Sequence, residues 1–516
     1  MSKNAKRAIS MLLAMLLIFG LVGCSSKEPE APPTNESEQK ETAYKDCLVI
    51  GDSETLSNLD PQANNSTYNR RIYEMTHNTL VRYDFTTGEY SPNLAESYEI
   101  SEDGLQYTFH LHQGVKFHNG DDCTAEDVVY TFERAMESST LANGIVGLEK
   151  VEAIDDYTVV MTLSAVNVEF IIGISSNGFV ILDKDAISAD SERGAMVGTG
   201  PYVMTEWAPD DYVLLTRNEN YFGELPKSKQ IKYRMISETS ARVIALQTGE
   251  IDICMEVPAI EAPHVADAEG CKLIELPSSK LAYVALNVSG ANEALMDIRV
   301  RQALQHATDT ATIITSMTEG YGQPANGFIP PAVWGYCADL KGYDYDIEKA
   351  KQLLADAGYA DGLNLSLLYQ KASFPGMFEL LEAQWSKVGV TLTIDTDDSS
   401  LVSDKLREKK YDMYMSQFLT TSPGEINQMW LGSSSSNRTL INDETLNTML
   451  TDALTISNPD ERLAKYAEIG QYINDTAAMI PLYIETMLFG VRDNVEGAKL
   501  LGNGRHELTY AYATVE

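Results

Sequence analysis

Apolar and polar residues alternate in short segments along the chain, and segments typical of strands and of helices follow one another. Tyr107, Phe109 and Leu111 alternate with polar residues, which predicts a strand, and Gly114 predicts the turn after it. A second alternating segment over residues 390–394 predicts another strand. Strands interspersed with helices throughout a chain are typical of α/β proteins, so we expect this fold class.

Capping residues mark the predicted helices. Thr124 and Asp127 form a capping-box pattern that predicts a helix over residues 125–136. Asp346 is the expected cap of another helix, and Gly358 its stop. A third helix is predicted over residues 377–387, before Gly389. A fourth starts at Asn458-Pro459, and four of its side chains are expected to face the core: Leu463, Tyr466, Ile469 and Ile473.

The N-terminus has the pattern of an export signal. Three basic residues precede an apolar run over residues 8–22, which is short for a membrane span. The run ends in Leu21-Val22-Gly23-Cys24, which resembles the lipobox of bacterial lipoproteins. We therefore expect a signal peptide over residues 1–23, followed by a lipidated Cys24 and a flexible polar tether over residues 24–44. The alternative is a plain signal peptide with a chance cysteine.

The length of the chain predicts its number of domains, and its charge excludes one class of partner. A chain of 516 residues is too long to fold around a single hydrophobic core, so two or three domains are expected. The formal net charge of −36 repels phosphate backbones and excludes a nucleic-acid partner. Five cysteines remain besides Cys24, an odd number. A Cys254–Cys271 disulfide and unpaired buried cysteines are both compatible with the sequence.

Enzyme signatures are absent from the sequence. It has no G-x-S-x-G, no H-E-x-x-H and no G-x-x-x-x-G-K-[ST] motif. His110, His112 and His118 cluster around one predicted strand and are a candidate metal site, although surface or packing roles explain them better. The acidic group Asp395, Asp397 and Asp398 would meet a cation or lie in a solvated loop. We expect no cofactor.

Residues 92–134 resemble a known signature. They are similar to extracellular solute-binding proteins of the peptide/nickel class, which include the oligopeptide- and dipeptide-binding components of ABC importers. The likeness covers nearly everything after residue 46 and continues in short segments at residues 58–61, 197–202, 248–253, 285–287, 297–304, 348–359 and 459–473.

The resemblance implies an α/β clamp of two lobes with an extra family-specific domain. Lobe one would combine residues 45–76, 183–280 and 486–516, and the family-specific domain, residues 77–182, would attach to it. Lobe two would be residues 281–485, with a hinge at the crossings near 280 and 485. Ligand would lie between the lobes and be buried by their closure.

The resemblance also implies how the ligand is held. An extended ligand would pair with protein main chain by β-augmentation. By position, the pairing strands would be Asn64, Asn65, Ser66 and Thr67 in lobe one, and Ser416, Gln417, Phe418, Leu419 and Thr420 in lobe two. Tyr283 stands where the family often has a ligand-facing aromatic, although a core tyrosine explains it equally well. Phe418 would wall the pocket.

One departure from the family pattern concerns the ligand amine. Peptide binders of the class carry an Asp that pairs with it, in a stretch that here reads QFLTTSP from Gln417 to Pro423 and lacks that Asp. A buried ammonium without an acid is costly, so another acid replaces the Asp or the ligand has no such amine. Glu425 is the nearest substitute, and Asp397 and Asp398 are weaker ones.

The expected function is therefore transport. The chain would be a monomeric, lipid-anchored receptor on the extracytoplasmic face of a bacterial membrane. It would capture a peptide or a related amine-bearing solute and deliver it to ABC permease subunits powered by separate ATPases. The alternatives are a nickel-chelate, opine or sugar receptor, a signalling-peptide receptor, a surface hydrolase, and an adhesin or chaperone-like surface protein.

Overall fold

The computed structural model describes residues 43–515 apart from 55, 64–65, 85–88, 139, 371–372, 397, 421 and 505. By its internal contacts the chain divides into residues 1–42 and residues 43–516. The predicted lipidation site, Cys24, and the predicted contact residues Asn64 and Asn65 lie outside the described residues. In the described part, no helix is long and apolar enough to cross a membrane.

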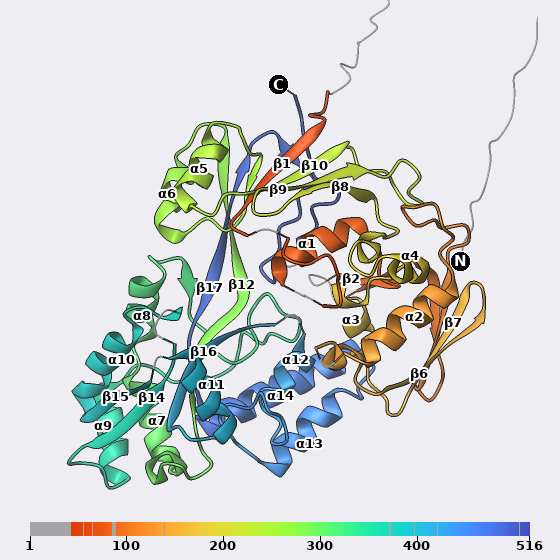
Figure 1. The fold of residues 1–516 in the computed structure, drawn as a ribbon. Coiled ribbons are helices and arrows are strands. Elements are labelled where there is room, and N and C mark those ends of the chain that lie inside the picture. Colours follow the sequence, from red (N-terminus) through yellow and green to blue (C-terminus); the bar gives the residue numbers. More distant parts are fainter. Residues whose placement is uncertain are drawn as a thin grey trace, which may run out of the picture. The chain divides into compact units, whose positions relative to one another are not determined.

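A mixed sheet of eleven strands joins segments from both ends of the described chain (Figure 1). Because strands and helices intersperse throughout, the predicted α/β class is confirmed. Across the sheet the strands are β15 (Val390–Thr396), β14 (Leu363–Leu368), β16 (Met413–Leu419), β12 (Cys271–Leu286), β17 (Met479–Arg492), β11 (Ile253–Cys254), β1 (Cys47–Asp52), β10 (Gln230–Met235), β9 (Tyr212–Arg217) and β8 (Tyr202–Ala208), with β13 (Gly322–Gln323) beside β17.

The two longest strands of this sheet, β12 and β17, run antiparallel along one another. Residues 271–277 of β12 pair with residues 486–492 of β17, and residues 281–285 pair with residues 479–484. The register shifts between Pro277 and Leu281, so the ladder is interrupted there. Each strand therefore has two separately paired halves.

A separate four-stranded antiparallel sheet has the order β4 (Ala95–Ile100), β5 (Gln106–Leu111), β7 (Thr158–Leu163), β6 (Leu148–Asp155). Helix α2 (Ala125–Met136) packs on β6 and β7. The Thr124 N–H donates to the Asp127 carboxylate (2.9 Å), as the capping pattern predicts. A short hairpin of β2 (Val81–Tyr83) and β3 (Tyr90–Pro92) lies nearby.

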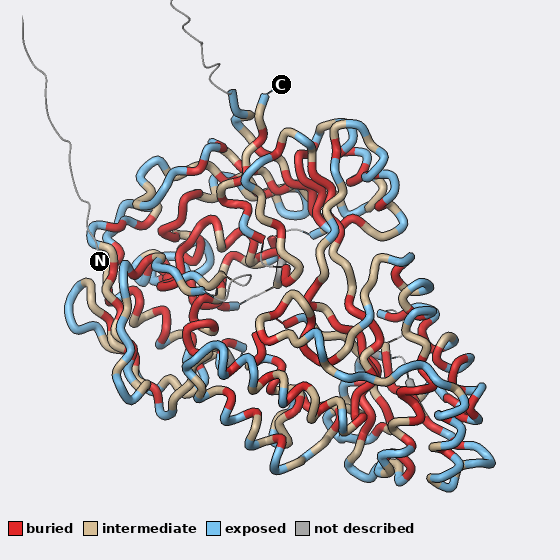
Figure 2. The backbone as a smooth tube through the Cα atoms, turned by 180° about the vertical axis from the view of Figure 1, so that it is seen from behind, coloured by how far each residue is buried: buried red, intermediate tan, exposed pale blue. Residues whose placement is uncertain are grey.

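The buried apolar residues form separate cores (Figure 2). One draws on residues 48–75, 196–255 and 489–513. A second lies wholly within residues 80–181, around the four-stranded sheet. Two more, within residues 282–483, pack on opposite sides of β12, because alternate β12 residues belong to each.

Local signals mark both ends of helix α9, as the sequence predicts. The Asp346 side chain accepts from the Lys349 N–H (2.9 Å) at the start of α9, and Gly358 has a positive φ of 95° just beyond its end. Besides α2, the bounds of the helices are α1 (Thr67–Thr76), α3 (Phe170–Ile174), α4 (Lys184–Ala189), α5 (Thr239–Gln247), α6 (Ala262–Ala266), α7 (Ile298–Ala307), α8 (Thr310–Met317), α9 (Ile347–Asp356), α10 (Met377–Trp385), α11 (Ser399–Glu408), α12 (Pro423–Asn427), α13 (Glu444–Ala453) and α14 (Pro459–Thr476).

Two details differ from or refine the sequence expectations. Leu463 in α14 is 39% exposed, so its predicted inward orientation is wrong; the buried Arg462 takes the place next to it. Of the two alternatives for Cys254 and Cys271, the structure has unpaired cysteines, and both are buried.

Candidate functional site

Strand β16 has one paired edge and one open edge. Residues Met413 to Leu419 pair antiparallel with β12 along their whole length. On the other side β14 pairs with β16 only at Met413 and Tyr414. Among the described strands nothing pairs with the rest of that edge, where the predicted contact residues Ser416–Leu419 lie. An open strand edge offers main-chain donors and acceptors to an extended ligand.

Two aromatic side chains stand beside this edge. Tyr283 pairs with Ser416 across the ladder, and its ring meets the Phe418 ring edge to face, with centroids 5.6 Å apart. Tyr283 is only 3% exposed and belongs to an apolar cluster with Phe328 and Trp430, whereas Phe418 is half-buried. In this structure Tyr283 therefore has the core position, and Phe418 is the aromatic nearer the surface.

Gln417 contacts the point where β12 and β17 change register. Lys280 Nζ lies 3.0 Å from Glu485 Oε2 there. In the amide orientation that satisfies both neighbours, Gln417 donates to Glu485 Oε1 and accepts from Lys280 Nζ, each at 3.2 Å. The Gln417 side chain thus links β16 to both long strands, and only its main chain remains for a ligand.

Thr420 and Glu425 form a small polar group after the strand. Thr420 is buried, and its Oγ1 lies 3.0 Å from both the Ser422 carbonyl oxygen and Glu425 Oε2. Ser422 caps α12 through its Oγ, which accepts from the Glu425 N–H (3.3 Å). The acid nearest to the missing Asp is thus held at the start of α12, six residues beyond Leu419.

The predicted strand over residues 64–67 is wrong at its described end. Ser66 is the N-cap of α1, where its side chain accepts from the Asn69 N–H (3.3 Å), and Thr67 is the first residue of the helix. The Ser-Thr pair before a polar helix favours capping over pairing, because the Ser oxygen satisfies a free helix N–H.

The other candidate acids and histidines that the structure describes make contacts within the fold. Asp398 caps α11 by accepting from the Ser400 and Leu401 N–H groups (3.0 and 3.1 Å), and hydrogen bonds from Ser400 and Leu401 lower its pKa. Asp397 lies outside the described residues. His118 Nε2 contacts the Gly200 carbonyl oxygen (3.0 Å), and His112 lies 3.6 Å from Glu96. No group of three His, Cys, Asp or Glu residues in the described part is placed to hold a metal.

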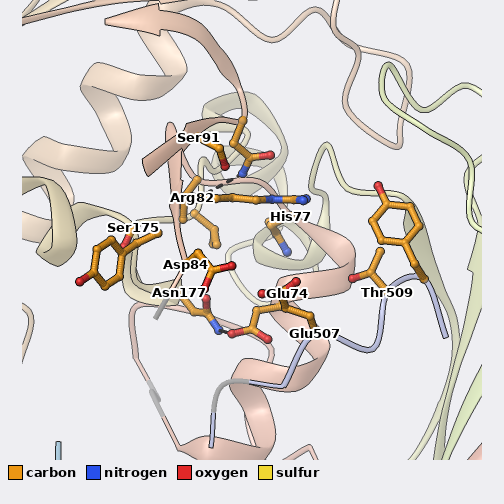
Figure 3. A pocket seen from close by; sticks show the side chains of 14 residues that line it. Glu74, His77, Arg82, Asp84, Ser91, Ser175, Asn177, Glu507 and Thr509 are labelled. Atoms are coloured by element: carbon orange, nitrogen blue, oxygen red, sulfur yellow. Dashed lines mark hydrogen bonds between the residues drawn. The ribbon is translucent and has the colours of Figure 1, made fainter. Parts of the chain in front are cut away.

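A cavity of about 240 Å³ opens elsewhere, between α1, the segment around β2 and the C-terminal residues 507–510 (Figure 3). Glu74 and Asn177 meet on its wall, where Asn177 Nδ2 donates to Glu74 Oε1 (3.0 Å). Buried His77 forms another part of the lining. The cavity includes none of the residues predicted to bind ligand. No sequence motif indicated it, because its walls come from three regions that are far apart in the chain: α1 with the β2–β3 hairpin, residues 175–180 and residues 507–510.

A second interaction that the sequence did not indicate joins residues 77–182 to α12. Glu169 Oε2 accepts from Ser422 Oγ (3.0 Å) and from the Gly424 N–H (2.9 Å). A lone Glu before an apolar helix carries no local signal for such a distant contact. The described residues thus offer an open strand edge, the half-buried Phe418 beside it and acidic groups nearby, an arrangement that can bind a solute.

Comparison with known proteins assigns the family. The family described as "Bacterial extracellular solute-binding proteins, family 5 Middle" matches residues 89–439. The chain belongs to this family. It is 29% identical over 453 residues to heme-binding protein A of Haemophilus influenzae, an alignment covering 79% of this chain and 81% of the relative. It is 30% identical over 353 residues to the dipeptide-binding protein of Escherichia coli K12, covering 62% and 66%.

The solved structures agree with this assignment. HbpA2 from Haemophilus parasuis superposes with a TM-score of 0.84 at 26% identity, covering 91% of this chain and all of that one. This family-5 protein is therefore a solute-binding component of an ABC importer, and its role is binding, not catalysis. The resemblance inferred from the sequence is confirmed.

Proposed function

We propose that this solute-binding protein captures a small peptide, or a related amine-bearing solute, by adding it as a strand to the open edge of β16. The observation that carries the proposal is that Met415 to Leu419 lack a partner strand on the side away from β12 among the described residues. Main-chain pairing at such an edge accepts any side chain, as a peptide importer requires.

The same proposal includes two lobes that close on the ligand. Lobe one comprises residues 45–76, 183–280 and 486–516, with the domain of residues 77–182 attached to it, and lobe two comprises residues 281–485. The register shift between Pro277 and Leu281, with the Lys280–Glu485 ion pair beside it, supports a hinge at these crossings.

Glu425 is the proposed partner of the ligand amine. It follows β16 closely, and Arg70 of α1 lies within its electrostatic reach: burial lowers the pKa of the Arg70 guanidinium, while Glu425 and Glu74 oppose that shift. Because Arg70 repels a second cation, a ligand ammonium would approach Glu425 from the side away from Arg70. The ligand's own anionic groups would then favour the Arg70 side.

Attachment to the membrane through Cys24 is the last part of the proposal. The basic start, the apolar run and the Leu-Val-Gly-Cys sequence support it. Metabolic labelling with a radioactive fatty acid tests it directly: the full chain should take up label, and Cys24→Ser should not.

Thermal unfolding of residues 25–516 tests the ligand class. The compounds are di- to pentapeptides, opines, sugars, nickel complexes and, because one relative is named for heme, hemin. A ligand at about 100 times its Kd stabilises the folded state by about 2.7 kcal/mol, which shifts Tm measurably. A peptide hit should lose its effect when its backbone amides are N-methylated, because methylation removes the donors that pair with β16.

Two variants refine the outcome. Glu425→Gln should weaken a peptide with a free amine by at least tenfold and leave its N-acetylated form unchanged, with exposed Glu149→Gln as control. A shift with a non-peptide solute alone contradicts the proposed ligand class, and a peptide that tolerates N-methylation contradicts strand addition.

A further inference from the structure

Glu169 joins the domain of residues 77–182 to the start of α12. Its Oε2 accepts two hydrogen bonds there, from Ser422 Oγ (3.0 Å) and from the Gly424 N–H (2.9 Å). Next to it the Val168 N–H donates to the Leu454 carbonyl oxygen (3.1 Å), so the same loop makes a second contact with distant residues. Figure 1 shows α3, which begins at Phe170, next to α12. We call the bonds of Glu169 to Ser422 and Gly424 the clasp.

The carboxylate of the clasp is enclosed, although the residue as a whole is half-buried. Its second oxygen, Oε1, is buried and has no hydrogen-bond partner. Residue 424 lies so close to this carboxylate that only glycine leaves room for it: a Cβ at position 424 would lie 2.0 Å from Glu169 Oε2. Glycine at 424 therefore permits the close approach of the carboxylate. In the ionised form the buried Oε1 would carry negative charge without a hydrogen-bond partner, which costs more free energy than burying the neutral carboxyl group.

Charged and titratable groups surround the clasp from several elements. Arg462 of α14 favours the ionised form of Glu169, whereas Glu425 of α12 disfavours it. Tyr83, Tyr90 and Tyr466 also lie within electrostatic reach, and burial together with Glu169 raises their pKa values. Desolvation outweighs the favourable contacts and raises the pKa of Glu169 from 4.5 to about 7.

We propose that the clasp is a proton-linked lock, in which closure of lobe two on the domain of residues 77–182 takes up a proton at Glu169. This inference rests on the proposed lobes. The protonated carboxyl keeps an oxygen that accepts from Ser422 and Gly424 and carries its proton on the enclosed Oε1. In the open protein water reaches Glu169, which then ionises as an ordinary carboxyl group.

The direction of the pH effect follows from these two states. A group whose pKa is higher in the closed state favours closure at low pH and loses that contribution as pH rises through the closed-state pKa. With values of 4.5 in the open state and about 7 in the closed state, the effect falls between these pH values. Lowering the pH from 7.5 to 5.5 should raise the closed-to-open ratio about twentyfold.

Hydrogen exchange of the Gly424 amide measures the clasp without any ligand. This N–H donates to Glu169, so its protection reports the closed-to-open ratio. After correction for the intrinsic pH dependence of exchange, peptides spanning Gly424 should be about twentyfold better protected at pH 5.5 than at pH 7.5. Glu169→Gln mimics the protonated form, so its protection should be the same at both values and should exceed that of the wild type at pH 7.5.

That last result separates a proton lock from a merely structural bond. If Glu169 held the clasp as an ionised acceptor, Glu169→Gln would remove the charge from these hydrogen bonds and lower protection at pH 7.5, which would overturn the proposal. An unchanged pH profile in this variant would overturn it as well. Exposed Glu149→Gln in the same domain is the control and should behave as the wild type.

Gly424→Ala tests the clasp from its other side. The added methyl group displaces the carboxylate, so protection should be low at both pH values, whereas a retained pH profile would contradict the proposal. Circular dichroism checks the fold of each variant. Because no ligand is used, a failure of peptide binding leaves this experiment unaffected.

Discussion

His77 is a buried histidine that the fold holds neutral. Its Nδ1 lies 2.8 Å from Thr76 Oγ1 and its Nε2 lies 3.1 Å from the Ala195 carbonyl oxygen, and a Cβ at Gly198 would lie 2.6 Å from the ring. Burial lowers the pKa of His77 from 6.5 to about 3. Between these values the unfolded chain binds a proton that the folded chain does not, so stability is lost as pH falls below about 6.5.

The size of this loss is measurable. Between pH 7 and pH 5, His77 should remove about 2 kcal/mol from the free energy of unfolding. Urea unfolding of wild type and His77→Gln at both pH values checks this: the variant is less stable at pH 7 but should lose about 2 kcal/mol less on acidification. Equal dependence in His77→Gln and the wild type would contradict the prediction.

Helix α14 shows how burial decides the cost of a substitution. Ile469 is completely buried in an apolar cluster with Ile473 and Tyr466, whereas Leu463 is 39% exposed on the same helix. Ile469→Ala should lower the free energy of unfolding by about 3 kcal/mol, because it leaves a cavity. Leu463→Ala should cost under about 1 kcal/mol. Chemical denaturation compares the two, and equal costs would contradict the assignment of the helix face.

The sequence predicts elements well where the signal is local. The caps at Asp346 and Thr124 and the alternating strand at Tyr107 are decided by neighbouring residues, and the structure has them all. The orientation of Leu463 is decided by what packs on α14, which periodicity alone does not contain.

The candidate site divides in the same way. A strand at Ser416 is predictable from the family pattern alone, and the structure has it. The open outer edge of β16 depends on where β14 ends, which the sequence of β16 does not contain. The clasp joins Glu169 to Gly424, 255 positions later, so it has no local signal either. The expected strand at Ser66 comes from the family pattern, which does not contain the local capping signal: the Ser66 oxygen caps α1 instead.

At the scale of the whole molecule, the crossings near residue 280 are tied to the C-terminal segment. The Ser279 N–H donates to the Gly502 carbonyl oxygen (2.9 Å), just where the β12–β17 ladder is interrupted. A Cβ at Gly502 would lie 1.8 Å from the Pro277 carbonyl oxygen, a backbone atom that cannot rotate away. Loop 500–504 therefore packs directly against the proposed hinge.

Gly502→Ala should consequently displace β12 at this point. We expect a loss of about 1–3 kcal/mol in the free energy of unfolding, as for other overpacked sites. If residues 277–281 are the hinge, the distance between spin labels on the two lobes should also change in the variant, as measured by electron paramagnetic resonance. Gly342→Ala is the matched control, since nothing lies within 4 Å of a Cβ there. If the Gly502→Ala protein is destabilised but keeps the wild-type interlobe distances, the contact between loop 500–504 and β12 does not affect lobe closure. The hinge would then lie elsewhere.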